Sequence, residues 1–485
     1  NIVSNYTVLV EAPARLPLGL NRTINVTITN TGNNFLQNVN ITLAIYNSSG
    51  SKMDWNNTPS FRLLNVSIGA SNTTNFTVSI PSNASPGTYN ITATANYSAI
   101  SKTNYTLSNV TQDIFVINVT TSHAEYEPGD YIEFINATIN NTSPDQSYSG
   151  VNSTAAIFNS SARQTFGPND SEIISANVQY SSNTTISWNN SSQGYLIPDG
   201  TSEGNYTVLV NTTWSGAKTN NSTTFGVVIV NASTSLNKSS INVSETVLLN
   251  VTILNNFSAT ITFTIDTEVW DAEGNNDTSL WTIAPQPQTL LVSGKSTNNT
   301  TINVTAPSNA INVPAGEYKI KAIVKYTDPN NHQKTKTNTS VVTVNPFRNL
   351  TSSEAAPDMP RGVDTNVSVT INNVGNIYVN DVYIELKIYD MSGGAMAWTI
   401  TPKKFTNQNV SYNSNIVREF TVSVPATAPI AEYYANATTH YEGGTKYVNT
   451  SDKFNVTEDI RMWIWNSPME AEPGDLLNWT KVRVK

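Results

Sequence analysis

INVTITNTGNNFLQNVNITLAIYNSSG, at residues 24–50, consists of two runs of alternating apolar and polar residues, separated by the turn Asn30-Thr31-Gly32-Asn33. Alternation of this kind predicts half-buried strands, and the Asn/Gly-rich turn predicts a tight reversal between them. A near copy, VSVTINNVGNIYVNDVYIELKIYDMSG, occupies residues 367–393 and aligns without a gap. The repeat predicts a tandem array built on this unit.

The chain length suits about four or five sandwich domains of ~110 residues each. Short alternating runs fill each unit, and no long helical period competes with them. We therefore expect an all-β chain, a tandem array of antiparallel sandwiches, with domains at residues 1–113, 114–226, 227–340 and 341–458. Residues 459–485 hold only two strand candidates, so we expect either a partial domain of a longer chain or a strand-donating tail that completes a sheet with another subunit.

A tyrosine directly after a turn marks the closing part of each of the first four units. A second aromatic residue follows about eight residues later, an even step that places both on one strand face. The tyrosines are Tyr89, Tyr206, Tyr318 and Tyr433, and the second residues are Tyr97, Trp214, Tyr326 and Tyr441. This placement resembles the tyrosine corner of Ig-like sandwiches, so we expect Ig-like β-sandwich domains with these rings in the core.

The composition excludes several classes of function. The net charge is −9 and no run is rich in Lys or Arg, which argues against nucleic acid or anionic lipid as a partner. The absence of cysteine excludes disulfides, thiol chemistry and Cys-based metal sites. The sequence contains no run of roughly 18 apolar residues, so it predicts no direct membrane span. We expect Asn1 to be a mature terminus or the start of a fragment.

Asparagine is unusually frequent at positions that fit N-glycosylation. Of about 67 asparagines, roughly 45 begin an Asn-x-Ser/Thr sequon, against about 16 expected by chance. In many sequons the middle residue is apolar, so a strand would turn Asn and Thr outward and the middle residue inward. We therefore expect an extracellular, cell-surface protein with N-linked glycans on the outer sheet faces. The candidate sites are Asn25, Asn40, Asn65, Asn75, Asn90, Asn118, Asn205, Asn250, Asn303, Asn366 and Asn455.

Two stretches within the array lack sequons, between Asn303 and Asn338 and between Asn366 and Asn409, and the tail has only Asn478. Bare surface is where protein can contact protein, and aromatic residues there can anchor an interface. The candidates for self-association are Tyr378, Tyr383, Trp398, Trp463, Trp465 and Trp479. The alternative is that each of these residues packs in the core of its own domain.

No pattern of catalytic residues emerges from the sequence. His123, His332 and His440 fall in separate predicted domains, and no phosphate loop or nucleophile elbow is present, so we expect no enzyme activity and no cofactor. One acidic stretch, Asp271, Glu273, Asn275 and Asp277, alternates oxygen ligands as calcium loops do. It aligns with the polar turns at residues 47–50 and 390–393, so an ordinary turn is the favoured interpretation and calcium the alternative.

Three recurring turns carry a family resemblance: Pro128-Gly129, Asn373-Val374-Gly375-Asn376 and Pro86-Gly87-Thr88-Tyr89. The pattern resembles CARDB-type Ig-like modules, and with the sequons the chain resembles archaeal surface-layer and surface-filament glycoproteins. That resemblance implies a structural subunit of a self-assembling extracellular filament or surface layer. The alternative function is an adhesin stalk or a carbohydrate-binding accessory array.

Overall fold

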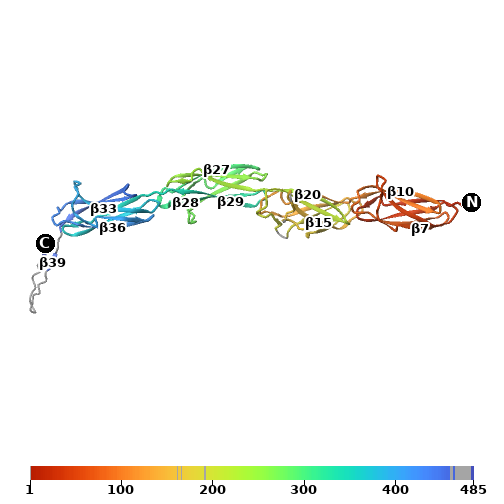
Figure 1. The fold of residues 1–485 in the computed structure, drawn as a ribbon, viewed down its shortest axis with the longest axis horizontal. Coiled ribbons are helices and arrows are strands. Elements are labelled where there is room, and N and C mark those ends of the chain that lie inside the picture. The colour runs from red at the N-terminus through yellow and green to blue at the C-terminus, as the bar shows by residue number, and fades with distance from the viewer. Residues whose placement is uncertain are drawn as a thin grey trace, which may run out of the picture. The chain divides into compact units, whose positions relative to one another are not determined.

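The computed structural model describes residues 2–160, 162–164, 166–190, 193–458, 462–464 and 482–484. Its regular structure is β, apart from two short 3-10 turns, η1 (Thr278–Leu280) and η2 (Ala310–Asn312), which confirms the predicted all-β array. The chain divides into two compact units, Asn1–Val230 and Asn231–Lys485. Each unit contains two sandwiches, numbered one to four along the chain (Figure 1).

Sandwich one packs the sheet β1-β3-β8-β6 against the sheet β2-β10-β9-β4-β5, in which β7 also pairs with β4. Its strands are β1 (Tyr6–Glu11), β2 (Arg15–Pro17), β3 (Asn21–Asn30), β4 (Leu36–Tyr46), β5 (Lys52–Met53), β6 (Asn57–Thr58), β7 (Phe61–Val66), β8 (Ser71–Ser79), β9 (Gly87–Tyr97) and β10 (Ile100–Thr111). β2 runs parallel to β10, and the other pairs are antiparallel. The first two strands, β1 and β2, therefore belong to different sheets of the sandwich.

Sandwich two repeats this order with the sheets β11-β14-β17 and β12-β20-β19-β15-β16, plus the pair β13-β18. Its strands are β11 (Ile114–Thr121), β12 (Glu125–Tyr126), β13 (Tyr131–Ile132), β14 (Ile135–Asn141), β15 (Tyr148–Phe158), β16 (Ile174–Val178), β17 (Ser182–Trp188), β18 (Tyr195–Leu196), β19 (Gly204–Trp214) and β20 (Ala217–Val227). Buried side chains of sandwiches one and two form one continuous core cluster in this unit.

Sandwich three has the sheets β21-β23-β27-β25 and β22-β29-β28-β24-β26. Its strands are β21 (Val230–Leu236), β22 (Ser240–Ile241), β23 (Thr246–Asn255), β24 (Ile261–Trp270), β25 (Thr282–Ala284), β26 (Gln288–Val292), β27 (Ser296–Thr305), β28 (Gly316–Thr327) and β29 (Gln333–Val344).

Sandwich four has the sheets β30-β32-β36-β34 and β31-β38-β37-β33-β35. Its strands are β30 (Leu350–Ala355), β31 (Met359–Pro360), β32 (Asp364–Asn373), β33 (Val379–Asp390), β34 (Thr399–Thr401), β35 (Lys404–Val410), β36 (Asn415–Ser423), β37 (Glu432–Tyr441) and β38 (Lys446–Thr457).

Two of the predicted domain limits need correction, because they fall inside strands. The limit after residue 226 cuts the last residue from β20, and the limit after residue 340 cuts four residues from β29. In both strands the final residues pair in parallel with the short second strand of the same sandwich, Val227 with Tyr126 and Val344 with Ile241. Both strands extend past the predicted limits to form this parallel pairing. The alternation of apolar and polar residues does not indicate where such a pairing ends. The remaining limits stay predictions.

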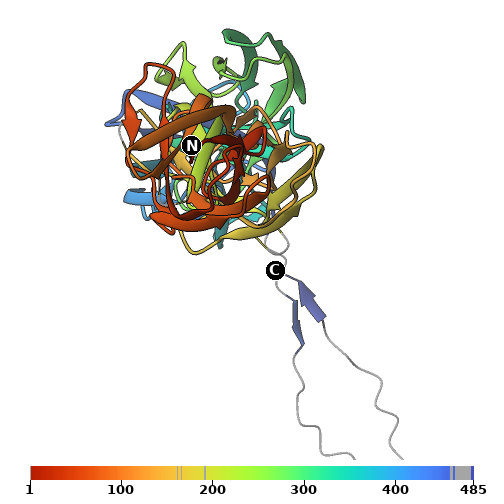
Figure 2. The same cartoon turned by 90° about the vertical axis from the view of Figure 1, so that its right-hand side faces the viewer.

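Two further short strands, β39 (Met462–Ile464) and β40 (Val482–Val484), pair antiparallel and lie side by side in Figure 2. The sequence predicts strands at both places. Whether they complete a sheet with another subunit stays a prediction. Within the described ranges, the structure contains no helix with the length and apolar character needed to cross a membrane.

A buried asparagine at the end of the second long strand recurs in all four sandwiches. In sandwich one, Asn30 Nδ2 donates to the carbonyl oxygens of Asn34 (2.8 Å) and Val66 (3.2 Å), and its Oδ1 accepts from Gly32 N–H (3.0 Å). Val66 belongs to the opposite sheet, so one side chain fixes the turn and joins both sheets. The equivalent residues, each at most 3% exposed and bonded in the same way, are Asn141, Asn255 and Asn373. We call this contact the asparagine lock.

The glycine of the repeated Asn-x-Gly-Asn turn is required by a close backbone approach. Thr31 N–H and Gly32 N–H both donate to the carbonyl oxygen of Asn5, at 2.9 and 3.0 Å. A Cβ on Gly32 would lie 2.3 Å from the carbonyl oxygen of Val3, and a Cβ on Gly375 would meet Phe347 at the same distance. The repeated turn therefore binds the segment that leads into the sandwich, which in sandwich one includes Val3 and Asn5. This contact lies next to the asparagine lock.

The predicted tyrosine corner is present in every sandwich. Each corner tyrosine is at most 5% exposed and donates its hydroxyl to the carbonyl oxygen four residues earlier. The distances are 3.0 Å for Tyr89, 2.9 Å for Tyr206, 3.1 Å for Tyr318 and 3.2 Å for Tyr433. The core role that the sequence predicts for these four rings is confirmed.

An asparagine on the last strand of sandwiches one, two and three reaches across to the first strand. Nδ2 of Asn104 donates to Val8 O (2.7 Å), Nδ2 of Asn221 to Val116 O (2.9 Å) and Nδ2 of Asn338 to Ala232 O (3.1 Å). We call this contact the asparagine clamp. Because the first strand has its remaining partners in the other sheet, the clamp joins the two sheets along a second line.

Sandwich four replaces the asparagine clamp with a carboxyl group. Thr450 stands at the clamp position, opposite Ala437, and Glu354 Oε2 on the first strand instead accepts from Ala437 N–H (3.2 Å). Among the described residues, its Oε1 is buried with no hydrogen-bond partner. Burial, opposed by the Ala437 bond and reinforced by the Asp452 carboxylate, raises the pKa of Glu354 to about 8. The side chain is therefore largely protonated at neutral pH.

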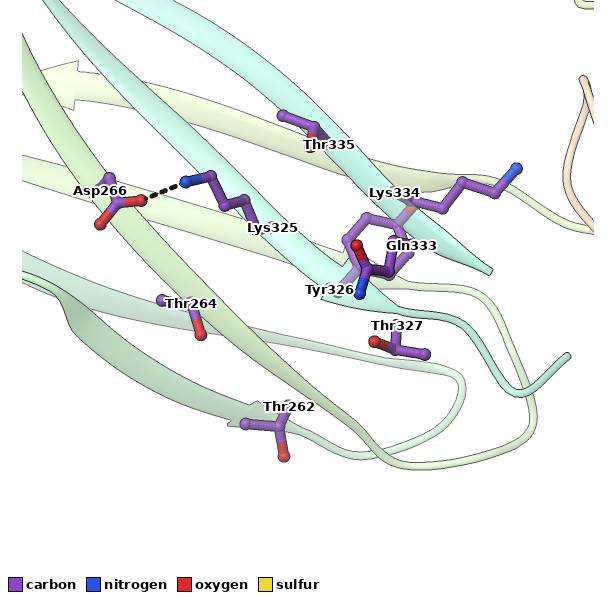
Figure 3. Close-up of a pocket in the computed structure, with 9 residues that line it drawn as sticks. All are labelled: Thr262, Thr264, Asp266, Lys325, Tyr326, Thr327, Gln333, Lys334 and Thr335. Carbon is purple, nitrogen blue, oxygen red and sulfur yellow. Dashed lines mark hydrogen bonds and ion pairs between the residues drawn. The ribbon is translucent and has the colours of Figure 1, made fainter. Parts of the chain in front are cut away.

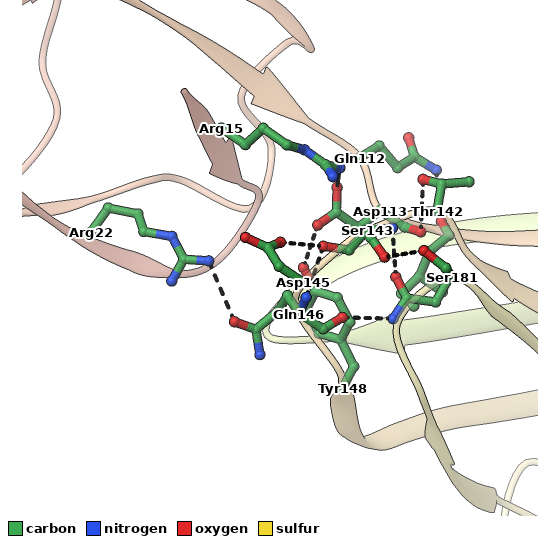
Figure 4. Close-up of polar contacts among 12 residues, drawn as sticks. Arg15, Arg22, Gln112, Asp113, Thr142, Ser143, Asp145, Gln146, Tyr148 and Ser181 are labelled. Atoms are coloured by element: carbon green, nitrogen blue, oxygen red, sulfur yellow. Dashed lines mark hydrogen bonds and ion pairs between the residues drawn. The ribbon is translucent and has the colours of Figure 1, made fainter. Parts of the chain in front are cut away.

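Within Asn1–Val230, a polar network joins sandwiches one and two (Figure 4). The fully buried carboxylate of Asp113 accepts from Arg15 (2.7 Å) and from the Tyr148 hydroxyl (2.8 Å). Burial and the nearby Asp113 carboxylate raise the pKa of Tyr148 above its usual value, which keeps this hydroxyl a donor. Arg22 adds a longer bond to Gln146 (3.4 Å). The short connection between these two sandwiches is thus held by hydrogen bonds as well as by the shared core.

Replacing Asn30 with Ala should loosen sandwich one. The change removes three hydrogen bonds and leaves buried carbonyl and N–H groups unpaired, at a cost of about 2–3 kcal/mol. Hydrogen exchange of peptides covering residues 24–66 should accelerate roughly 30- to 150-fold. The matched control is Asn25→Ala on the same strand, whose side chain is exposed; equal acceleration by both changes would contradict the lock.

The stability of sandwich four should fall as pH rises. The folded-state pKa of Glu354, about 8, lies above the unfolded value of 4.5, so its stabilising contribution is complete below pH ~4.5 and is lost as pH rises through 8. The full effect is on the order of 5 kcal/mol. Glu354→Gln keeps an acceptor for Ala437 and should flatten this pH dependence, measured by hydrogen exchange in peptides from residues 350–457. An unchanged slope in that variant would assign the dependence to other groups.

Candidate functional site

The sequon asparagines predicted to carry glycans lie on the outward side of their strands. Eight are exposed and three are partly buried, namely Asn40, Asn90 and Asn250. The middle residue of every one of these eleven sequons is in the core, at most 4% exposed: Val26, Ile41, Val66, Phe76, Ile91, Val119, Tyr206, Val251, Val304, Val367 and Val456. The third residue, Ser or Thr, is in no case buried. The inward-outward alternation that the sequence predicts is therefore present, while sugar attachment stays a prediction.

Three other sequons have a structural role that competes with modification. The clamp residues Asn104, Asn221 and Asn338 each begin an Asn-x-Ser/Thr triplet. Each is partly buried, and its Nδ2, the atom that a sugar would join, donates to the first strand of the sandwich. The sequence alone does not separate these asparagines from the outward ones, because the distinction depends on which strand lies beneath the side chain.

The predicted assembly residues of sandwich four do not share one environment. Tyr378 is 44% exposed in the turn between β32 and β33 and stays a candidate. Tyr383 points outward on β33, where its ring stacks on His440 with 4.2 Å between the centroids. The neighbouring strands carry the sequons of Asn436 and Asn449 on this same face. The sequon gap around Tyr383 in the sequence is therefore not a gap on the surface.

Trp398 packs in the core of its own domain, the alternative to a role in assembly. Its ring lies 5.0 Å from that of Tyr433 and 6.2 Å from that of Phe454, packed against the core of sandwich four. The same contact with the corner tyrosine is made by Trp55 in sandwich one (4.8 Å) and by Trp281 in sandwich three (5.2 Å). A contact repeated in three sandwiches is a feature of the fold and not an anchor for a neighbouring chain.

The remaining assembly candidates lie in the tail. Trp463 is in β39, whose backbone alone is described, and Trp465 and Trp479 lie outside the described residues. The role of these tryptophans in assembly stays a prediction.

Sandwich three presents a sheet face without outward sequons. β24, β26 and β28 contain no asparagine, and the one asparagine of β29 is the clamp residue Asn338. The face instead carries an ion pair between Lys325 and Asp266 (2.8 Å) and a lysine, Lys321, 3.6 Å from the centre of the Trp270 ring. We call it the bare face. An open depression of about 590 Å³ lies on it, lined mainly by Thr and Lys side chains together with Asp266, Tyr326 and Gln333 (Figure 3).

The acidic stretch considered for calcium forms a hydrogen-bonded hairpin turn. Asp271 accepts from the backbone N–H and the side-chain amide of Asn275, both at 2.7 Å, and these bonds lower its pKa. Asp390 makes the same backbone bond to Gly394 (2.7 Å), and Asn47 makes it to Ser51 (2.9 Å). The geometry matches the ordinary-turn interpretation. Burial and the charges of Asp271 and Glu273 raise the pKa of Asp277, and calcium binding here stays a prediction.

The three histidines each lie in a different sandwich and pack locally. His123 makes an edge contact with Tyr126 (5.7 Å between centroids), His332 Nδ1 lies 3.2 Å from Asp328 Oδ2, and His440 stacks on Tyr383. Asp328 also accepts from backbone N–H groups of its own turn, at Asn330 and His332. Each histidine therefore contributes to the local packing of a turn or a sheet face.

Comparisons with known proteins relate one part of the chain to a described domain family. Residues 18–98, within sandwich one, match a domain family described as the NPCBM-associated, NEW3 domain of alpha-galactosidase. This is a β-rich, carbohydrate-associated domain, and the match lends no support to the CARDB resemblance or to an archaeal origin. Among curated proteins, no sequence relative matches the chain.

One similar solved structure is a family 123 glycoside hydrolase from Clostridium perfringens, described as showing glycolipid glycan hydrolysis. It is 12% identical to this chain, with a TM-score of 0.19. The alignment covers 22% of this chain and 27% of that chain. At this level the likeness carries no argument about function.

A site-by-site glycan map of the native protein should separate two kinds of sequon. Outward sites such as Asn25, Asn303 and Asn366 should carry sugar, whereas the clamp residues should be unmodified, because their Nδ2 atoms are bonded between the sheets. Mass spectrometry of glycopeptides measures this directly. Full occupancy at Asn221 or Asn338 would show that the clamp does not form in the native chain.

Proposed function

We propose that the chain is a structural subunit of an extracellular, N-glycosylated assembly, either a filament or a surface layer. The observation that carries the proposal is the repeated sequon geometry, with asparagines outward and the residue between Asn and Ser/Thr in the core of all four sandwiches. The same strands thus supply inward side chains to the core and outward asparagines to which sugar would be attached. No catalytic step is assigned to the chain.

Self-association is supported by the contrast between sequon-bearing and bare faces. Glycans on the outward sequons would keep neighbouring chains apart, because a branched, hydrated sugar blocks close packing. The bare face of sandwich three combines Trp270, Asp266 and two lysines, and a mixed face of this kind suits a polar interface. We propose that a second copy of the chain contacts this face, with Tyr378 as a further candidate contact.

A second function is favoured by one specific observation, the match of residues 18–98 to a carbohydrate-associated domain. In this second function the chain would be an adhesin stalk or a carbohydrate-binding accessory array. It would act as a spacer beside a distinct binding domain. The two functions differ in whether copies of the chain contact one another.

Charge reversal on the bare face should prevent assembly. Native material should form an ordered filament or lattice under the electron microscope, with intact masses well above 52.7 kDa because of attached sugar. The variant Lys321→Glu/Lys325→Glu should remain dispersed, because it loses a cation–π contact and an ion pair and adds like charges.

The matched control is Lys218→Glu, on the corresponding sheet of sandwich two, where sequons begin at Asn211 and Asn220. This variant should assemble normally. Isolated native particles would favour the stalk or accessory array. Normal assembly of the double variant would place the contact elsewhere.

A further inference from the structure

The outer face of the sheet β33-β37-β38 in sandwich four brings two sequons between two sets of aromatic rings. Along β37, Tyr434, Asn436, Thr438 and His440 point outward, because each pairs with an outward residue of β38. The residues opposite them on β38 are Lys453, Ser451, Asn449 and Tyr447. Asn449 and Ser451 belong to one sequon, and Asn436 and Thr438 to the other. In each case a tyrosine stands two residues before the asparagine, on the same face.

Tyr447 is the most exposed ring of this face, at 64%. Its inner side rests against His440, with 5.9 Å between the ring centroids, and His440 stacks almost parallel on Tyr383 at 4.2 Å and 7°. At the other end of the face, Tyr434 stacks on Tyr389 at 5.3 Å and 13°. Neighbouring rings hold both tyrosines, so their open surfaces are preformed and little side-chain freedom remains to be lost on contact.

We propose that the first sugar of an N-linked glycan on Asn449 packs on the open surface of Tyr447. Asn449 and Tyr447 are two positions apart on one strand, about 7 Å, so a pyranose ring attached to Asn449 Nδ2 reaches the tyrosine ring without any movement of the strand. The inference deepens the proposed function and rests on it, since it requires that the chain be N-glycosylated. Asn436 with Tyr434 forms the second site of the same kind.

The physical basis is burial of one apolar sugar face. The C–H groups on one side of a pyranose carry partial positive charge, and the face of an aromatic ring is negative, so the two attract while water leaves both surfaces. The sugar hydroxyls stay toward solvent and toward the polar row between the aromatic residues, where Thr438 lies opposite Asn449 and Glu385 lies opposite Thr438. The contact turns an exposed tyrosine into part of a sandwich-sugar interface.

The test uses the full chain made in a host that N-glycosylates it, with thermal unfolding of residues 350–457 followed by site-resolved hydrogen exchange. Tyr447→Ala should lower the unfolding temperature of this sandwich by about 2–4 °C in the glycosylated chain. In an Asn449→Gln background the same change should have an effect below about 1 °C. In an Asn366→Gln background, which removes a sugar from the other sheet of this sandwich, the full effect should remain.

Three outcomes would overturn the inference or its premise, and they are distinguishable. An equal effect of Tyr447→Ala with and without Asn449 would show that Tyr447 acts without the sugar. Unmodified Asn449 beside modified Asn366 would remove the occupant while leaving the proposed function in place. A chain without sugar at any sequon, seen in its intact mass, would contradict the proposed function itself. Proton resonances of the Asn449 sugar shifted upfield by the tyrosine ring would support the packing directly.

Discussion

The fold depends on a buried amide that satisfies three backbone groups at once. In each sandwich the asparagine lock closes its own turn, holds the following loop and reaches the end of a strand in the opposite sheet. Two facing sheets share no backbone ladder, so the directional bonds that set their mutual register come from side chains, the asparagine lock at one end and the asparagine clamp along a second line. Asn30 and its three counterparts each supply a directional hydrogen bond between the two sheets. The Gly32 turn and the Tyr89 corner add further hydrogen bonds in the same sandwich.

The surface follows from the core through the period of the strand. Once Val26, Val304 and Val367 are fixed inward, the residues on either side of each must face outward, and in this chain those residues form sequons. A sheet face is then free of sequons only where all of its neighbouring strands lack outward sequons. On the bare face of sandwich three, adjacent strands contain no outward sequon, whereas the sequence gap around Tyr383 lies beside Asn436 and Asn449 from other strands.

Local pattern was sufficient for much of the fold. Alternation predicted the strands, the Asn-x-Gly-Asn turn predicted the reversals at Gly32 and Gly375, and the corner position predicted the buried ring of Tyr89, whereas Tyr97 is only partly buried. The partners across the sandwich were not predictable, because they depend on register between distant strands. Trp398 is therefore a core ring on Tyr433 and not a bare surface residue, β29 extends past the expected limit to pair with β22, and the clamp residue Asn104 cannot be told from an outward sequon by its triplet.

The central claim is that one set of strands builds the core inward and a sugar coat outward, leaving defined protein surface for contact between copies. A cryo-electron microscopy map of the native material at side-chain resolution tests it most directly. The account predicts sugar density extending from outward asparagines in all four sandwiches, with contacts between chains on surface without sequons. Outward asparagines without density, or chains packed through the sequon-bearing faces, would contradict it.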